Sequence, residues 1–343
     1  MSEISKNISV LPEYALPGAE VEVVFGGLRY ELPGELKCIL DSTYMPWIAS
    51  SSRRMIVRVR YDQSSVERGE LFVESSTGSI GPAFLTIPQW LVGDMHIVAN
   101  PTIDPKNNSI VLTRSGGRGQ QLPATLFRLE EDGFLDELPV DIPNPTGMAF
   151  DADGRLYVTN RKDGVVCRID GDLEAVPVAT GLGIATGIAF DSNGIMFVGD
   201  RTGTIYRILA DGTPDEFARL EPSVAAYHMA FGPDRRLYVS APGLASYEPI
   251  YAIDTNGEVS VYFKGFGRPQ GIAFDTEGTL YIAGCYKGRR GIFSVEFGAT
   301  EARHLIAGNM IVGLCIDREG NMIVATGDTV YSFALGIKGT LLN

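Results

Sequence analysis

The sequence predicts an all-β protein of two domains, a small β-sandwich followed by a β-propeller. A phrase of about sixteen residues recurs between residues 98 and 326, which indicates a repeat architecture. The residues before it lack the phrase but alternate apolar and polar side chains, as half-buried strands do. The 343 residues include 40 glycines and 19 prolines, which suits a chain with many turns, and no segment has a convincing helical period.

Composition and charge exclude several classes of partner. Hydrophobic residues make up 45% of the chain, enough to bury a core. The formal net charge of −13 repels a nucleic-acid backbone, so no nucleic-acid partner is expected. No apolar run reaches the roughly 18 residues of a membrane helix, and "MSEISKNISV" lacks a signal-peptide pattern. We therefore expect a cytoplasmic protein that does not bind membranes.

The four cysteines have no metal-binding spacing, and reduced, buried thiols are expected. They are Cys38, Cys167, Cys285 and Cys315.

Residues 7–87 form the first predicted domain. Its strand-like runs are "AEVEVVFGG", "LKCILD", "RMIVRVRY", "GELFVESS" and "PAFLTI", separated by turn residues at sandwich-like intervals. The opening "VLPEYALPGAEVEVVFGG" and the closing "GELFVESSTGSIGPAFLTI" resemble IPT/TIG domains, an immunoglobulin-like family. The resemblance implies a spacer or interaction module, so a protein partner or self-association is expected through this domain.

Residues 88–336 form the second predicted domain, a six-bladed propeller. The repeat copies are "PTGMAFDADGRLYVTN", "ATGIAFDSNGIMFVGD", "AYHMAFGPDRRLYVSA", "PQGIAFDTEGTLYIAG", "IVGLCIDREGNMIVAT" and the weaker "VANPTIDPKNNSIVLTR". Their anchor positions at 147, 187, 228, 271 and 313 lie 40 to 43 residues apart. A period near forty that is built from four short strands is typical of a propeller blade.

The residues of each copy suit that architecture. Small residues such as Gly147 and Gly271 allow the innermost strands to converge. The aspartate after each first strand, for example Asp151 or Asp275, is expected to cap a tight turn rather than bind a metal.

A strand near residues 89–93 is predicted to close the ring. The stretch "WLVGDMHIVANPTID" parallels "HLIAGNMIVGLCID", whose first residues form a fourth strand, while the last copy has no fourth strand of its own. An N-terminal strand in that place removes exposed sheet edges.

The phrase "PxGIAFDxxGxLYVxx" resembles NHL repeats and the gluconolactonases and senescence-marker lactonases. The lactonase resemblance implies a divalent cation at one channel mouth, held by Glu, Asn and Asp near the anchor position. The residues before the anchors here are Ala99, Thr146, Thr186, Tyr227, Gln270 and Val312. A hard cation such as calcium normally needs several oxygen ligands that include carboxylates, so we expect a degenerate metal site and no cofactor.

The channel mouth supplies the candidate binding residues. They are Thr146, Asn160, Thr186, Asp200, Tyr227, His228, Gln270 and, from the basic and aromatic loop "GCYKGRRGIF", Tyr286. His228 and Asp200 are also the candidate catalytic residues, because His228 replaces an anchor glycine and imidazole transfers protons near neutral pH. The alternative is structural: Asp200 caps a loop and His228 plugs the channel.

Two functions remain open on the sequence. The first is a propeller that binds a small molecule, a peptide or a protein at the channel mouth. The alternative, which the resemblance implies, is a gluconolactonase-like hydrolase of a sugar lactone or related ester, which would need calcium or a similar cation. A streptogramin-lyase-like enzyme is disfavoured by the shortage of channel-facing His and Glu. Convergence of Asp200 and His228 on one cavity would favour an enzyme.

Overall fold

The computed structural model describes residues 8–26, 28, 35–60, 68–97, 99–115, 122, 124–171 and 173–340. These residues form β-strands and no α-helix, which confirms the all-β prediction. Within these ranges no helix is long and apolar enough to cross a membrane. The chain divides into two compact units, which are described separately. The first comprises Met1–Trp90, Arg289–Phe293 and Arg303–Asn309, and the second comprises Leu91–Gly288, Ser294–Ala302 and Met310–Asn343.

The first unit contains two sheets. One has the order β1-β3-β7-β6, with β1 (Ile8–Leu11), β3 (Glu20–Phe25), β7 (Arg54–Arg58) and β6 (Trp47–Ser50). The other runs β30-β2-β9-β8-β4-β5, with β30 (Arg303–Ala307), β2 (Tyr14–Ala15), β9 (Gly78–Thr86), β8 (Arg68–Ser75), β4 (Lys37–Leu40) and β5 (Thr43–Met45).

One apolar core joins these two sheets. Alternate residues of β3, such as Val21 and Val23, are fully buried, as the period of two requires. They share this core with Met55 of β7 and Leu71 of β8. The strand pattern predicted for this segment is therefore confirmed.

The second unit contains antiparallel sheets of four successive strands. The first is β11 (Thr102–Ile103), β12 (Ile110–Thr113), β13 (Leu126–Leu129) and β14 (Leu135–Leu138). The next is β15 (Pro145–Phe150), β16 (Leu156–Asn160), β17 (Val165–Ile169) and β18 (Ala175–Ala179). It is followed by β19 (Ala185–Phe190), β20 (Met196–Asp200), β21 (Thr204–Ile208) and β22 (Pro214–Arg219).

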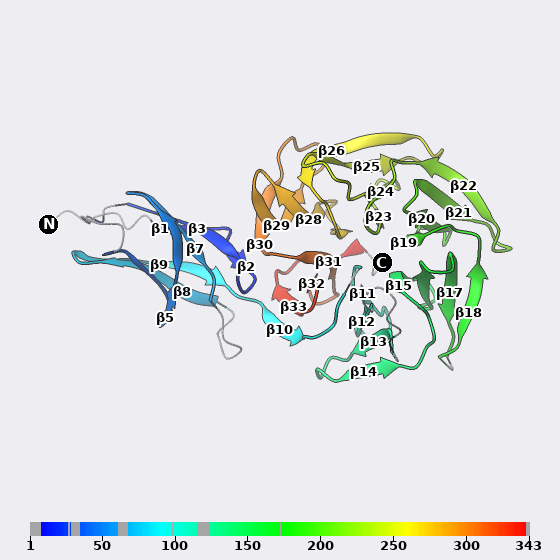
Figure 1. The fold of residues 1–343 in the computed structure, drawn as a ribbon, viewed down its shortest axis with the longest axis horizontal. Helices are drawn as coiled ribbons and strands as arrows, with labels where there is room; N and C mark the ends of the chain where they lie inside the picture. Colours follow the sequence, from blue (N-terminus) through cyan, green and yellow to red (C-terminus); the bar gives the residue numbers. More distant parts are fainter. Residues whose placement is uncertain are drawn as a thin grey trace. The chain divides into compact units, whose positions relative to one another are not determined.

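The remaining strands continue the pattern. They are β23 (His228–Phe231), β24 (Leu237–Ser240), β25 (Glu248–Ile253) and β26 (Val259–Gly267), then β27 (Ile272–Phe274), β28 (Leu280–Tyr286) and β29 (Arg289–Val295). The innermost strands β11, β15, β19, β23 and β31 (Ile311–Ile316) gather around one centre, and the later strands of each sheet lie outward (Figure 1). This arrangement is that of a β-propeller, as predicted.

The close approach of the inner strands explains the anchor glycines. A Cβ atom on Gly147 would lie 2.4 Å from the carbonyl oxygen of Thr186 on the next inner strand, and one on Gly313 would lie 2.6 Å from that of Ala99. Neither contact is possible for a larger residue, because backbone atoms cannot move aside as side chains do. The predicted role of small residues at these positions is confirmed.

The predicted closing strand is also confirmed. The strand β10 (Gln89–Val92) is the outer strand of a sheet with the order β10-β33-β32-β31, where β33 is Val330–Ala334 and β32 is Asn321–Thr326. Val92 packs into a core with Ile323 and Val330.

The repeated aspartates cap turns, as predicted. The Oδ1 atom of Asp151 accepts hydrogen bonds from the backbone N–H groups of Asp153 (3.0 Å) and Arg155 (2.9 Å). Asp275 makes the same pair of bonds with Glu277 (3.0 Å) and Thr279 (2.8 Å). The residue spacing explains the repetition, since each copy needs the same tight turn between its first two strands.

Candidate functional site: the channel mouth

The candidate residues lie at the end of the propeller where the first strands begin and the second strands end. Asn160 and Asp200 end β16 and β20, and His228 begins β23. Asn160 and Asp200 therefore occupy corresponding positions of successive sheets, and His228 lies at the same end of the next sheet.

Asp200 is bound by its own loops. Its Oδ1 atom accepts hydrogen bonds from the backbone N–H groups of Ile184 (2.9 Å) and Thr202 (3.0 Å), and its Oδ2 atom accepts one from the Thr202 hydroxyl. Oδ2 also faces Gly183 so closely that a Cβ there would lie 2.4 Å away, at a φ of +61°. Asp200 thus has the geometry of a loop cap, with both oxygens engaged.

The amide and hydroxyl groups of the neighbouring candidates are also engaged. Asn160 donates from Nδ2 to Asp163 (2.8 Å) and accepts from the N–H of Lys162 (3.0 Å). Thr146 donates to the carbonyl of Asn144 (3.4 Å). Thr186 donates to the carbonyl of Gly199 (3.3 Å) and accepts from the backbone N–H of Tyr227 (3.1 Å). Each of these bonds lies within the chain, so these side chains chiefly hold the loops of the mouth.

Tyr227 is fixed at the same end. Its hydroxyl donates to the carbonyl oxygen of Glu221 at 2.5 Å, and the residue is 1% exposed. Burial, followed by the charge of Asp200, raises the pKa of the phenol well above its usual value, so Tyr227 stays protonated at neutral pH.

His228 differs from the other candidates because one of its ring atoms has no partner. The side chain is buried, with 4% exposure, and its Nε2 atom makes no hydrogen bond to the described residues. Burial lowers the pKa of this imidazole to about 4, while a side-chain interaction with Gln270 opposes the shift. The ring is therefore neutral at pH 7, and a buried, unpaired nitrogen costs about 1–3 kcal/mol.

The hydroxyl of Ser240, the residue paired with His228 in the sheet, donates to the Gln270 carbonyl at 2.6 Å. This contact links the sheet position of His228 to the backbone of Gln270.

Two exposed apolar residues, missed in the sequence, lie in the loop between β24 and β25. Leu244 is 92% exposed and Tyr247 is 62% exposed. The carbonyl of Pro242 in this loop accepts hydrogen bonds from Ser223 Oγ (2.8 Å) and Val224 N–H (2.9 Å), which ties it to the segment leading to Tyr227. Only a lone Tyr in a Gly- and Ser-containing loop, "PGLASYEP", marked it in the sequence.

Tyr286 lies beside Tyr247. A Cβ on Gly265, whose φ is +124°, would approach Cε2 of Tyr286 to 3.2 Å and Cε2 of Tyr247 to 3.3 Å. The Tyr286 hydroxyl donates to Glu301 at 2.9 Å, and its ring packs against Phe266. The structure thus pairs Tyr286 with Tyr247, and the contacts above link His228 with Gln270.

Arg161 and Arg201 follow Asn160 and Asp200 and add positive charge at the mouth. Neither has an ion-pair partner among the described residues. Burial, and then the charge of Arg201, lowers the pKa of the Arg161 guanidinium. The two cations are therefore close enough to repel each other.

The donor set does not fit a divalent cation. The described residues contain no group of three or more His, Cys, Asp or Glu side chains that could hold a metal. The one carboxylate among the mouth candidates, Asp200, already accepts hydrogen bonds at both oxygens. Neutral hydroxyl, amide and imidazole groups remain beside the cations Arg161 and Arg201, and these suit recognition of a polar ligand better than metal chemistry.

Comparisons with known proteins agree with the fold. No family model matches the chain, and no curated protein matches its sequence. A gluconolactonase from Xanthomonas campestris is 18% identical, covering 73% of this chain and 88% of its own, with a TM-score of 0.59. A streptogramin B lyase structure is 16% identical, covering 81% and 88%, with a TM-score of 0.53.

A third structure is similar over nearly the whole chain. It is an auxiliary nutrient binding protein from Bacteroides thetaiotaomicron, 11% identical, covering 96% of this chain and 98% of its own, with a TM-score of 0.56. At these identities the likeness concerns the fold alone, a β-propeller shared with a gluconolactonase and a streptogramin B lyase.

Proposed function

We propose that this protein binds a small, neutral, polar molecule of the sugar class at the channel mouth beside β23. The observation that carries the proposal is the unpaired Nε2 atom of the buried, neutral His228. A ligand hydroxyl would satisfy this nitrogen and recover the cost of leaving it unpaired. The exposed ring of Tyr247 would pack against the apolar face of the same ligand.

A binding role accounts for the state of the candidate catalytic residues. An imidazole with a pKa of about 4 is a weak base at pH 7, and general-base catalysis works best when the pKa lies near the operating pH. Both oxygens of Asp200 already accept hydrogen bonds from groups of its own loops. The alternative, a metal-dependent hydrolase of a sugar lactone, would require these bonds to be exchanged for metal ligands.

The whole-chain similarity to the Bacteroides thetaiotaomicron protein, described as an auxiliary nutrient binding protein, supports a binding role. We further propose that the propeller has six blades and that residues 7–87 form an immunoglobulin-like, IPT/TIG-type domain. That domain would serve as the surface for a protein partner or a second copy of the chain.

The experiment is calorimetric titration of the full chain with neutral mono- and oligosaccharides and with sugar lactones, together with a lactone-hydrolysis assay. We expect binding by part of the panel without turnover. Tyr247→Ala should weaken binding about tenfold, the loss expected for one aromatic contact. Tyr44→Ala is the matched control, because Tyr44 is also an exposed tyrosine and belongs to the other unit.

Lactone turnover that Asp200→Asn abolishes would replace the binding proposal with the hydrolase. Binding that Tyr247→Ala leaves unchanged would move the ligand away from this mouth.

A further inference from the structure

A separate cavity lies between the first two sheets of the propeller, at the end opposite the channel mouth. Its volume is about 520 Å³, within the range of small-molecule sites. It is formed by the turn after β11, the turn between β15 and β16 and the turn between β17 and β18. Because these turns join the other ends of the strands, the cavity does not share residues with the mouth.

The floor of this cavity is apolar. Leu138 and Leu156 are buried in the core that the two sheets share, and Phe150, Ile169 and Leu173 are half-buried against the same core. A cavity of this kind leaves apolar surface in contact with water, so an apolar body placed there would gain about 25 cal/mol per Å² buried.

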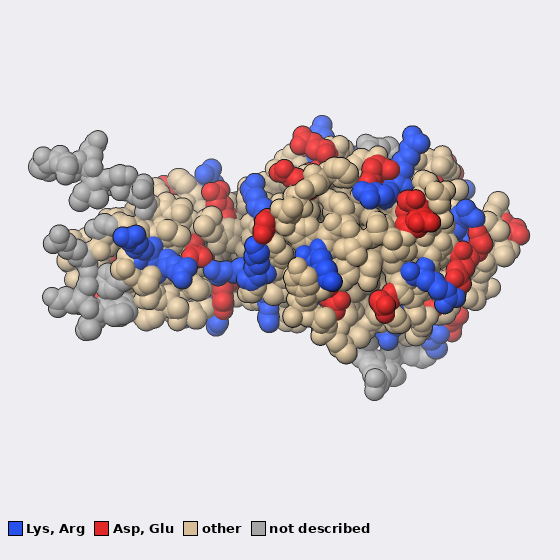
Figure 2. All heavy atoms as spheres, turned by 90° about the horizontal axis from the view of Figure 1, so that it is seen from above, with Lys and Arg blue, Asp and Glu red and all other residues tan. Residues whose placement is uncertain are grey.

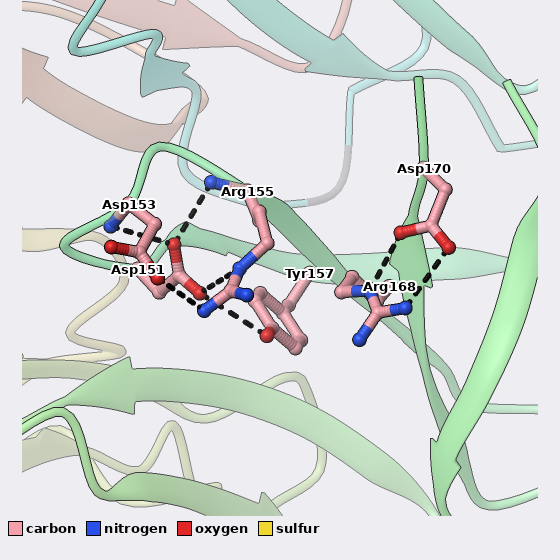
Figure 3. A network of polar contacts seen from close by, with 6 residues as sticks. All are labelled: Asp151, Asp153, Arg155, Tyr157, Arg168 and Asp170. Carbon is pink, nitrogen blue, oxygen red and sulfur yellow. Dashed lines mark hydrogen bonds and ion pairs between the residues drawn. The ribbon is translucent and has the colours of Figure 1, made fainter. Parts of the chain in front are cut away.

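Most charged groups around the cavity already have partners. Arg155 contacts Asp151 (2.7 Å) and Asp153 (2.6 Å), and Arg168 holds Asp170 with two bonds of 2.6 and 2.9 Å (Figure 3). Figure 3 shows each guanidinium turned toward its own carboxylates. These pairs join three carboxylates to two guanidiniums, so they leave one negative charge in excess, and they fix the side chains of the rim.

Two cationic groups keep free donors. The Nε atom of Arg128 is buried and makes no hydrogen bond, although an Nη2 atom of the same residue contacts Asp104 at 3.3 Å. Lys106 has no ion pair among the described residues, and its stem lies over Gly154, where an added Cβ would come within 2.6 Å of Lys106 Cε. The unpaired groups of this cavity are thus donors on cations.

We propose that this cavity binds a small organic carboxylate with an apolar body. The carboxylate would accept charge-assisted hydrogen bonds from Lys106 Nζ and Arg128 Nε, and the apolar body would cover Phe150 and Leu156. A neutral ligand would leave the lysine charge unpaired. The proposal rests on residues other than those of the mouth, so an experiment can disprove ligand binding at one site without affecting the proposal for the other.

The experiment compares 3-phenylpropionate with 3-phenylpropionamide, which has the same shape and no charge, by calorimetry and ligand-observed NMR on the full chain. We expect the carboxylate to bind at least about tenfold more tightly, since charge-assisted bonds are roughly twice as strong as neutral ones. Lys106→Met should reduce the affinity for the carboxylate to that for the amide. Lys162→Met, which removes an exposed lysine of the next sheet, should leave both affinities unchanged.

A second variant tests the cavity independently of charge. Gly171 lines the cavity, and a Cβ at this position would meet no atom within 4 Å, so Gly171→Trp should fold and fill the cavity. It should abolish binding of both probes. Equal affinities of the two probes, binding that survives both Lys106→Met and Gly171→Trp, or absence of binding to the unsubstituted chain would each overturn the proposal.

Discussion

At the scale of single residues, His228 is the anchor position where a buried imidazole replaces glycine. At the other four anchors the residue is glycine, where the next inner strand lies close. The strands β15 and β19 each begin two residues before their anchors, Gly147 and Gly187. Beside His228, β27 begins at Ile272, one residue after its anchor Gly271. Burial keeps the His228 ring neutral at pH 7.

The buried imidazole makes stability depend on pH. The folded-state pKa of His228 is about 4, against about 6.5 in the unfolded chain. As the pH falls from 6.5 toward 4, the unfolded chain takes up a proton that the folded chain refuses, so the free energy of unfolding decreases. Between pH 7 and pH 5, His228 should lower the free energy of unfolding by about 2 kcal/mol.

Urea unfolding of His228→Asn at the two pH values checks this expectation. Between pH 7 and pH 5, the free energy of unfolding should fall by about 2 kcal/mol less in the variant than in the unsubstituted chain. His304, whose pKa burial also lowers to about 4, remains in both proteins and acts as the internal control. Parallel pH profiles would mean that His228 is already protonated or solvated in the folded state.

At the scale of elements, the sequence predicted the strands that repeat and missed the loop that does not. The closing strand was recognisable because "WLVGDM" matches "HLIAGNM", the fourth strand of another copy. The loop with Leu244 and Tyr247 has no counterpart in the other copies, so no comparison within the chain could mark it. Sequence repeats therefore predict the strands of the scaffold well, but they do not predict the inserted loops that shape a binding site.

The closing strand β10 should be sensitive to charge on one side only. Val92 is buried in the core with Ile323 and Val330, whereas Gln89 is exposed. Val92→Asp should lower the free energy of unfolding by about 3 kcal/mol or more, because an unpaired carboxylate would enter an apolar core. Gln89→Asp should change it by less than about 0.5 kcal/mol. Urea unfolding of both variants measures the difference, and similar values would contradict burial of this strand.

At the scale of the whole molecule, the surplus of acidic residues creates no cluster of three or more metal-ligating side chains within the part of the chain that the structure describes. On the face drawn in Figure 2, Lys and Arg side chains lie among Asp and Glu in small mixed groups. The aspartates of the repeat cap turns through backbone N–H groups, a role their spacing predicted. The expectation of a degenerate metal site rests on residue types at fixed repeat positions, and it stays a prediction. Which oxygens and nitrogens stay unpaired depends on tertiary contacts, and no sequence pattern encodes those.

Metal removal should therefore leave the folded state unchanged. We expect the same thermal melting temperature in excess EDTA and in excess calcium chloride, measured by circular dichroism. If the folded chain bound a cation, a free concentration of 100 times the Kd would add about 2.7 kcal/mol to the free energy of unfolding. The melting temperature would then rise measurably. Such a calcium-dependent rise would contradict the absence of a cation site.

The position of β10 in the sheet with β33 also has a consequence for how the chain acquires its structure. A ribosome makes residues 89–92 long before residues 330–334, so this sheet cannot form until β33 has been made. During that interval, the backbone hydrogen-bonding groups of β10 and of the sheet that it completes stay unpaired. Unpaired sheet edges promote aggregation between chains. Bringing together segments so far apart in sequence is also slow. The nascent chain should need protection from aggregation until β33 emerges.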